Sequence, residues 1–112
     1  MNSTLKREEE YMTVNEMFTY ISSLQIPTAY NVFKTPQTPP YICISILSSD
    51  NFFSDDSVTK KINHWYVELY TDKKDPVTEE MLEAILPPWN KNEDYLNDEK
   101  LYVVQYEFDD VE

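Results

Sequence analysis

Apolar residues return along this chain with two different periods, and the two periods predict helices and strands in turn. Between residues 13 and 24 they recur every three or four positions, and Thr13 and Glu16 have the spacing of a capping box. This pattern predicts an amphipathic helix over residues 13–24, which Pro27 closes.

A second helix is predicted to begin at Asp75-Pro76, because aspartate is a favoured N-cap and proline suits the first helical position. Pro87-Pro88 ends this helix. Its predicted apolar stripe consists of Met81, Leu82, Ile85 and Leu86. We expect its acidic residues to point to water; they are Glu79, Glu80 and Glu83.

Alternating apolar and polar residues predict the strands. Residues 41–47 place three isoleucines on one face, and residues 28–33 and 89–96 predict shorter strands, the first of them at a sheet edge. Residues 101–108 predict the last long strand, and residues 48–61 are expected to be a long connection. The stretch 62–70 predicts a strand with two different faces. One face carries Trp65, Val67 and Leu69, and the other carries His64, Tyr66, Glu68 and Tyr70.

The order helix, strands, helix, strands predicts one α+β domain with an antiparallel sheet of four or five strands and two helices packed on one face. A chain of 112 residues suits one domain with one modest core. We expect the domain over residues 12–108, with a flexible N-terminal segment at residues 1–11 and an acidic tail at residues 109–112.

The charge balance narrows the classes of partner. The chain has 21 acidic and 9 basic residues, a net charge of −12, which argues against binding to nucleic acid or to an anionic membrane surface. The single cysteine, Cys43, permits no internal disulfide and fits a reducing compartment. Neither a signal peptide nor a membrane-spanning stretch is expected, so we expect a soluble protein made inside the cell.

Glycine is absent, which excludes a P-loop, a dinucleotide fingerprint and a nucleophile elbow. Turns that need a positive φ are expected at Asn or Asp in the stretches "SSDN", "KNED" and "LNDEK".

Candidate catalytic groups find no partners in the sequence. His64 shares a strand face with Glu68, but four residues at ~3.3 Å each separate them by roughly 13 Å. We therefore expect His64 on a half-exposed sheet face and Cys43 in the core. A loop with Asp50, Asp55 and Asp56 lacks the glycine and terminal glutamate of a calcium loop. No enzyme activity, cofactor or metal is predicted.

Phe52 and Phe53 are adjacent in a polar stretch, where neighbouring side chains of an extended chain point opposite ways. Either one of them packs back onto the sheet, or the pair anchors a neighbouring subunit, and the sequence leaves both open. The predicted subunit or partner interface consists of Asn51, Phe52, Phe53, Asp55, Tyr66 and Tyr70.

The motifs also support a resemblance to a known family. They are the "NFF-D" stretch, the block Lys61–Pro76 and the proline-rich "TPPYI", within "MTVNEMFTYISSLQIPTAYNVFKTPQTPPYICISIL", "NFFSDDSVTKKINHWYVELYTDKKDP" and "EKLYVVQYEF". Over about residues 12–108 the chain resembles the short tail-completion or tail-terminator proteins of long-tailed phages and prophages of Gram-positive bacteria.

This resemblance implies a ring, typically a hexamer, that caps the head-proximal end of the tail tube. Its partners would be other copies of the chain, the major tail tube protein and the head-tail connector protein, and its location the virion after assembly in the host cytoplasm. The fold that it implies is a small sheet flanked by helices.

Two other functions stay open. One is a head-closure or connector component of the same virion, which only the partner's identity would distinguish. The other is an acidic DNA mimic that inhibits a host nuclease, favoured by small size and negative charge. An enzyme is the weakest alternative, because one histidine and one cysteine do not assemble a catalytic set.

Overall fold

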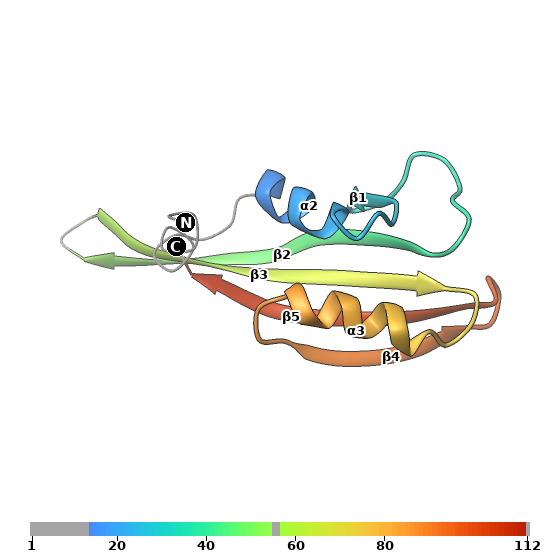
Figure 1. Cartoon of the computed structure of the whole chain (residues 1–112). Coiled ribbons are helices and arrows are strands. Elements are labelled where there is room, and N and C mark those ends of the chain that lie inside the picture. The colour runs from blue at the N-terminus through green and yellow to red at the C-terminus, as the bar shows by residue number, and fades with distance from the viewer. Residues whose placement is uncertain (1–13, 55–56, 112) are drawn as a thin grey trace.

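The computed structural model describes residues 14–54 and 57–111, with side chains described over residues 15–50 and 62–110. Two helices and five strands follow one another along these residues (Figure 1). They are α2 (Val14–Ser22), β1 (Thr28–Tyr30), β2 (Tyr41–Ser54), β3 (Ser57–Thr71), α3 (Pro76–Ile85), β4 (Asn90–Leu96) and β5 (Leu101–Val111). The segment 1–11 of the sequence analysis lies outside the described residues.

The five strands form one sheet in the order β1-β2-β3-β5-β4. All pairs are antiparallel except β1 and β2, which run parallel with Thr28 opposite Ile42. The expectation of a purely antiparallel sheet is therefore wrong, and the sheet is mixed. The reason is the proline-rich connection 31–40, which carries the chain back to the starting end of β1 so that both strands point the same way.

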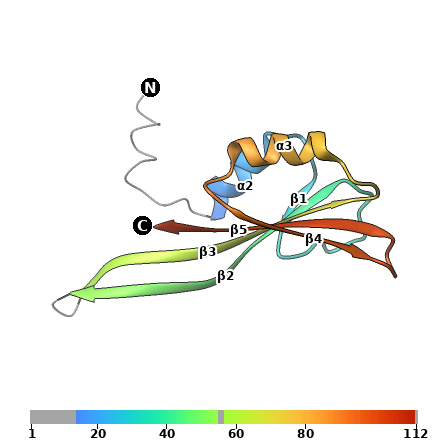
Figure 2. The same cartoon turned by 90° about the horizontal axis from the view of Figure 1, so that it is seen from below.

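Both helices cover the same face of the sheet, as expected (Figure 2). Strand residues two apart project to one side, so alternate residues of β2, β3 and β5 meet the helices there. The core consists of Met17, Ile21, Ile42, Ile44, Trp65, Val67, Leu69, Leu82, Leu86, Val104, Tyr106 and Phe108. We call the sheet face away from the helices the open face.

Helix α3 begins as the sequence predicts but presents a different stripe to the sheet. Leu82 is buried as expected, whereas Met81 is exposed. Glu79 is buried and Glu83 is half-buried, so the expectation that they point to water is wrong; only Glu80 does. Helical spacing accounts for both positions, because Glu79 lies three residues before the buried Leu82, and Glu83 lies one turn after Glu79.

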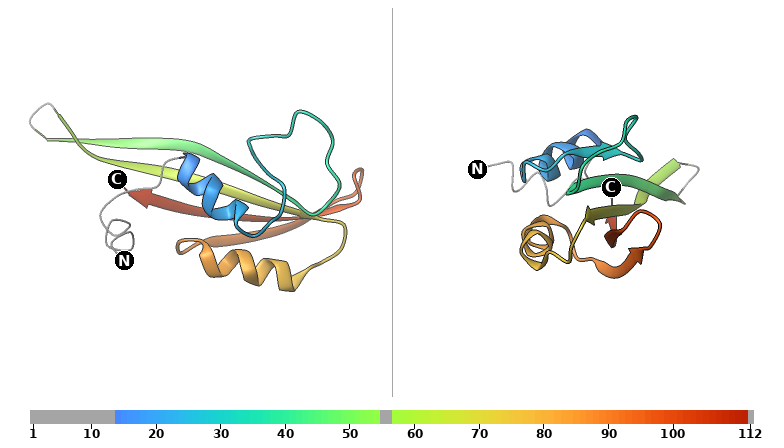
Figure 3. Two further views of the ribbon diagram at one scale, coloured as in Figure 1. Left: turned by 45° about the horizontal axis from the view of Figure 1, so that its top comes forward. Right: turned by 90° about the vertical axis from the view of Figure 1, so that its right-hand side faces the viewer.

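Strands β2 and β3 form a hairpin much longer than expected. They pair as far as Ser54 opposite Ser57, whereas β5 accompanies β3 only as far as Ile62 opposite Val111. We call the two-stranded remainder, residues 51–54 of β2 and 57–61 of β3, the arm. The arm projects from one end of the sheet (Figures 1, 2 and 3), and the molecule measures 51 × 32 × 25 Å along its principal axes.

Two expected irregular segments are therefore strands. Residues 48–54 and 57–61 belong to β2 and β3 rather than to a long connection, and residues 109–111 are not a tail but the paired end of β5. Both segments are rich in polar residues, and for this reason the sequence predicted irregular structure. Hydrogen bonds between paired strands satisfy the backbone whatever the side chains are. At Leu47 the β2–β3 register shifts by one residue, which marks a β-bulge where the hairpin leaves the helix-covered part of the sheet.

Positive φ angles occur at residue types that were not expected. Among the described residues they are Gln25, Asn31 and Lys100. Asn31 has an expected residue type but lies outside the three predicted stretches, and Lys100 lies in "LNDEK" but is neither Asn nor Asp. The stretches "SSDN" and "KNED" belong to β2 and β4, so the expectation of turns there is wrong. Lys100 closes the "NDEK" turn between β4 and β5, where its N–H donates to the carbonyl of Leu96. The hydrogen bond that closes this turn offsets the conformational cost, about 1–2 kcal/mol, of a left-handed backbone at Lys100.

In the part of the chain that the structure describes, no helix is long and apolar enough to cross a membrane.

The cap of α3 yields the first test. The Asp75 carboxylate accepts from the Thr78 N–H at 3.2 Å and from its hydroxyl at 2.7 Å. We expect Asp75→Ala to lower the free energy of unfolding by about 1 kcal/mol, because a helix donor loses its acceptor. Urea unfolding followed by tryptophan fluorescence measures this. The exposed Asp72→Ala is the control, and equal losses in both variants would contradict a capping role.

Candidate functional site

A cleft of about 530 Å³ lies on the open face, beneath the connection 31–37. In Figure 2 this connection passes on the side of the sheet opposite to the helices. Two neighbouring strands line the cleft, β2 through Tyr41 and Cys43 and β3 through Glu68 and Tyr70. The hairpin between β4 and β5 closes one side.

Aromatic rings form the wall of this cleft. The rings of Tyr41 and Tyr70, which are opposite each other in the β2–β3 register, stack at 4.8 Å between centroids and 16° between planes. Phe33 of the connection meets Tyr41 edge to face at 5.6 Å. The Tyr70 hydroxyl donates to Glu68 Oε1 at 3.1 Å, and Gln105 Nε2 donates to Glu68 Oε2 at 3.1 Å.

Burial and negative charge govern the titration of these groups. Burial, and then the nearby Glu68 carboxylate, raise the pKa of the Tyr70 hydroxyl and of the Cys43 thiol. Burial raises the pKa of Tyr41 as well, with further contributions from Cys43, Glu99 and Glu68. Cys43 is buried, as expected, and its thiol stays protonated at neutral pH.

His64 lies at the root of the arm between two carboxylates from neighbouring strands. Its Nδ1 is 2.6 Å from Asp109 Oδ1 on β5, and its Nε2 is 2.8 Å from Asp50 Oδ2 on β2. The expectation that His64 has no carboxylate partner is therefore wrong, although Glu68 is not the partner. Hydrogen bonds to Asp50 and then Asp109 raise the pKa of this histidine. Sequence reasoning missed both partners because it placed them in a loop and in a tail.

This arrangement joins three strands rather than activating a nucleophile. A histidine that acts as a general base needs one ring nitrogen facing the group it deprotonates. Both nitrogens of His64 face carboxylates, so the ring in its protonated form donates twice and joins β2, β3 and β5.

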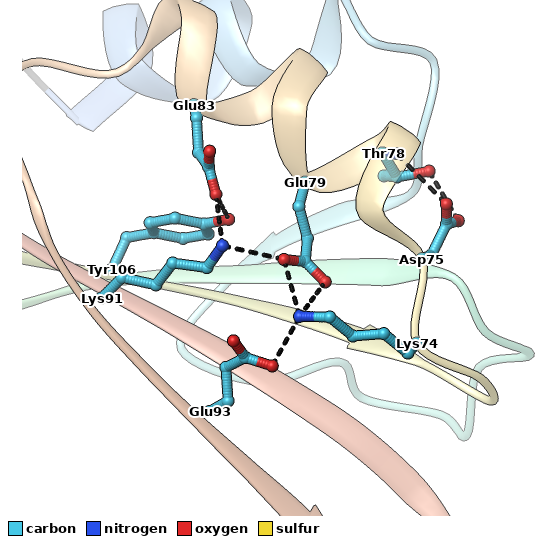
Figure 4. A network of polar contacts seen from close by, with 8 residues as sticks. All are labelled: Lys74, Asp75, Thr78, Glu79, Glu83, Lys91, Glu93 and Tyr106. Carbon is cyan, nitrogen blue, oxygen red and sulfur yellow. Dashed lines mark hydrogen bonds and ion pairs between the residues drawn. The ribbon is translucent and has the colours of Figure 1, made fainter.

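A network of charged side chains joins α3 to β4 and β5 on the helix-covered face (Figure 4). The Glu79 carboxylate is 2.9 Å from Lys74 Nζ and 2.9 Å from Lys91 Nζ. Lys91 Nζ also lies 2.7 Å from Glu83 Oε2, which accepts the Tyr106 hydroxyl at 2.7 Å. Lys74 contacts Glu93 as well. These contacts explain how Glu79 is tolerated almost fully buried.

The network favours the charged forms of Lys91 and Glu83. Burial lowers the pKa of Lys91, but its bonds to Glu83 and Glu79 outweigh this and raise it overall. Burial raises the pKa of Glu83, and bonds from Lys91 and Tyr106 reverse the sign and hold it below its usual range. Because both lysines and the Tyr106 hydroxyl contact carboxylates within the network, we assign it a structural role.

The structure describes the side chains of two of the six predicted interface residues, Tyr66 and Tyr70. Tyr66 and Tyr70 share the open face, but only Tyr70 lines the cleft. Asn51, Phe52 and Phe53 belong to β2 within the arm, where side chains are not described. Asp55 and Asp56 lie outside the described residues. Cleft residues that the sequence analysis did not assign to a site include Phe33, Tyr41 and Glu99, which come together only through the sheet pairing.

A scan of protein-family models and a search of curated proteins both found no match to this chain. In the described residues no group of three or more histidine, cysteine or acidic side chains is arranged to hold a metal ion.

The charged network yields the second test. Glu79→Gln removes the carboxylate that two lysines share and leaves Lys91 half-buried with one anionic partner. We expect a loss of about 2 kcal/mol in the free energy of unfolding. Glu80→Gln changes the exposed neighbour and is expected to stay within about 0.5 kcal/mol of the unchanged chain. Urea unfolding of both variants measures these free energies. A Glu79→Gln variant as stable as the unchanged chain would contradict the structural role of the network.

The histidine yields the third test. The pKa of His64 is raised above its ordinary 6.5, so its stabilisation is fully present below pH 6.5 and is lost as the pH rises through the folded value. The stability difference between the unchanged chain and His64→Gln should therefore be larger at pH 5.5 than at pH 8.5. Urea unfolding at both pH values measures it. Asp109→Asn should reduce the same pH dependence.

The control for this test is Asp98→Asn, at an exposed position in the turn between β4 and β5. It should leave the pH dependence unchanged. A difference between His64→Gln and the unchanged chain that does not vary with pH would contradict the charged bridge.

Proposed function

We propose that this chain is a non-enzymatic structural protein of a phage tail. Copies of it form a ring, typically a hexamer, that caps the head-proximal end of the tail tube and joins it to the head connector. The observation that carries the proposal is the projecting arm, together with the unpaired strand edge that leads to it.

The outer edge of β2 is available for pairing. Strand β1 accompanies β2 only from Ile42 to Ile44, and just beyond it the Ile46 N–H donates to the Tyr30 hydroxyl at 3.3 Å. Beyond Ile46, no strand among the described residues pairs with this edge up to Ser54. An unpaired edge presents a row of backbone donors and acceptors, which another chain can continue as a sheet.

An exposed apolar side chain lies on the same edge. Leu47, at the β-bulge, is 58% exposed, although its neighbours Ile44 and Ile46 pack on or against the core. A two-stranded hairpin without a third layer is only marginally stable in water. The arm and Leu47 therefore have the character of a surface that is completed by a partner.

A projecting arm suits a closed ring. When an arm on one copy meets a different patch on the next, the interface is heterologous, and rotation closes it into a ring. The net charge of −12 per chain would also suit a ring around DNA, because an acidic lumen repels phosphate and lets the duplex slide. The resemblance to tail terminators supplies the partners: further copies, the tail tube protein and the connector.

The fourth test concerns assembly. Multi-angle light scattering of the full chain, alone and with tail tube protein, should give the mass of a ring, with the hexamer as the expected species. A monomer that ignores both tube and connector proteins would overturn the proposal. Assembly with the connector alone would move the chain to head closure. Binding to a nuclease that DNA displaces would favour the acidic inhibitor.

Two variants locate the interface. Leu47→Ser should weaken assembly at least tenfold, since burying a leucine contributes about 2 kcal/mol. Val77→Ser is the matched control, because Val77 is 68% exposed on α3, away from the arm. A shortened chain, with residues 52–60 replaced by Asn-Gly as a tight hairpin turn, should stay folded but no longer assemble. Equal effects of Leu47→Ser and Val77→Ser would contradict an interface at the arm.

A further inference from the structure

The open-face cleft combines aromatic rings with carboxylates in a way that selects the charge of an occupant. Its lining includes the stacked pair Tyr41 and Tyr70, the carboxylates Glu68 and Glu99, and one cation, Lys34. The two carboxylates come from elements far apart in the sequence, β3 and the β4–β5 turn, and face one volume of about 530 Å³. From this geometry we infer that the cleft binds an arginine side chain of a partner protein.

The aromatic wall accounts for the shape of the occupant. A guanidinium is planar and weakly hydrated, and it stacks on tyrosine faces, whose π-systems attract cations. Tyr41 contacts the stacked ring of Tyr70 and meets Phe33 edge to face, and Tyr70 is also held by its hydrogen bond to Glu68. A wall that is already ordered reduces the entropy lost when a flexible side chain binds.

The carboxylates account for the charge. Each oxygen of Glu68 accepts one hydrogen bond, from Tyr70 and from Gln105, which leaves each with a free lone pair. Glu99 has no cationic partner among the described residues. A guanidinium carries five donors and can bond to both carboxylates while it lies against the rings.

The same negative charge, in addition to burial, raises the pKa values of groups that line the cleft. Glu68 contributes to the raised pKa of Tyr41, Cys43 and Tyr70, and Glu99 to that of Tyr41. Lys34 is exposed on the connection and does not pair with either carboxylate in the described structure. An anionic ligand would meet two carboxylates, and an apolar one would strip them of water without replacing their hydrogen bonds.

We take a different protein as the source of the arginine, because this chain contains a single arginine, Arg7, in 112 residues. A second copy contains only that one guanidinium, and substitution of Arg7 separates this source from a different protein. The inference does not rest on ring formation, because the cleft lies within one chain.

The test is a titration of the isotope-labelled full chain with acetyl-Gly-Arg-Gly-amide, followed by NMR. We expect saturable shifts at Tyr41, Cys43 and Tyr70, with a Kd of about 1–10 mM for so small a ligand. The matched peptide with citrulline keeps the shape but lacks the charge, and should bind at least tenfold more weakly. Equal binding of both peptides, or shifts outside the cleft, would overturn the inference.

Variants assign the contacts. Glu99 lies in an exposed turn, so Glu99→Gln should weaken binding of the arginine peptide about fivefold without affecting the fold. Glu68→Gln should weaken binding of this peptide to a similar extent. Glu107→Gln is the control, on the open face but outside the cleft. Equal binding by Glu99→Gln, Glu68→Gln and Glu107→Gln would refute the site. Tighter peptide binding by Arg7→Gln would mean that the chain's own arginine occupies the cleft, and would overturn the partner protein as its source.

Discussion

Strand β3 is hydrogen-bonded on both sides through its central part, to β2 on one side and to β5 on the other, and most of this structure depends on that double pairing. Its side chains alternate, so one strand serves both faces. Trp65 enters the core under the helices, whereas Glu68 and Tyr70 line the cleft on the open face. Where β5 ends, the same strand continues with β2 alone and becomes the arm.

Each face of the sheet uses charge differently. On the covered face, Glu79 is buried because Lys74 and Lys91 reach it from the chain segments before α3 and in β4. On the open face, Glu68 and Glu99 border a cleft whose one lysine does not pair with them. A buried charge requires a partner within the fold, and a carboxylate that borders water leaves room for a partner from outside.

The long hairpin, finally, links the shape of the domain to its proposed assembly. The bulge at Leu47 interrupts the register where the helix-covered sheet ends, and His64 joins three strands a short distance beyond it. A β-bulge bends a strand and increases its twist, and bridging side chains hold the bent strands together. The root of the arm is therefore fixed to the domain, although the arm itself has no third strand.

Local periodicity was sufficient to predict what depends on neighbours in the sequence: the helix that starts at Asp75, the alternation of β3, the buried Cys43 and helices on one face. It failed where a residue's environment comes from a distant strand. The sequence placed Asp50 in a loop and Asp109 in a tail, whereas the strand register brings both next to His64. It placed Glu79 on the solvent-exposed face of a helix, whereas Glu79 is buried and pairs with two lysines. The parallel β1, the arm and the cleft were likewise decided by tertiary structure, because strand pairing joins residues that no local pattern relates.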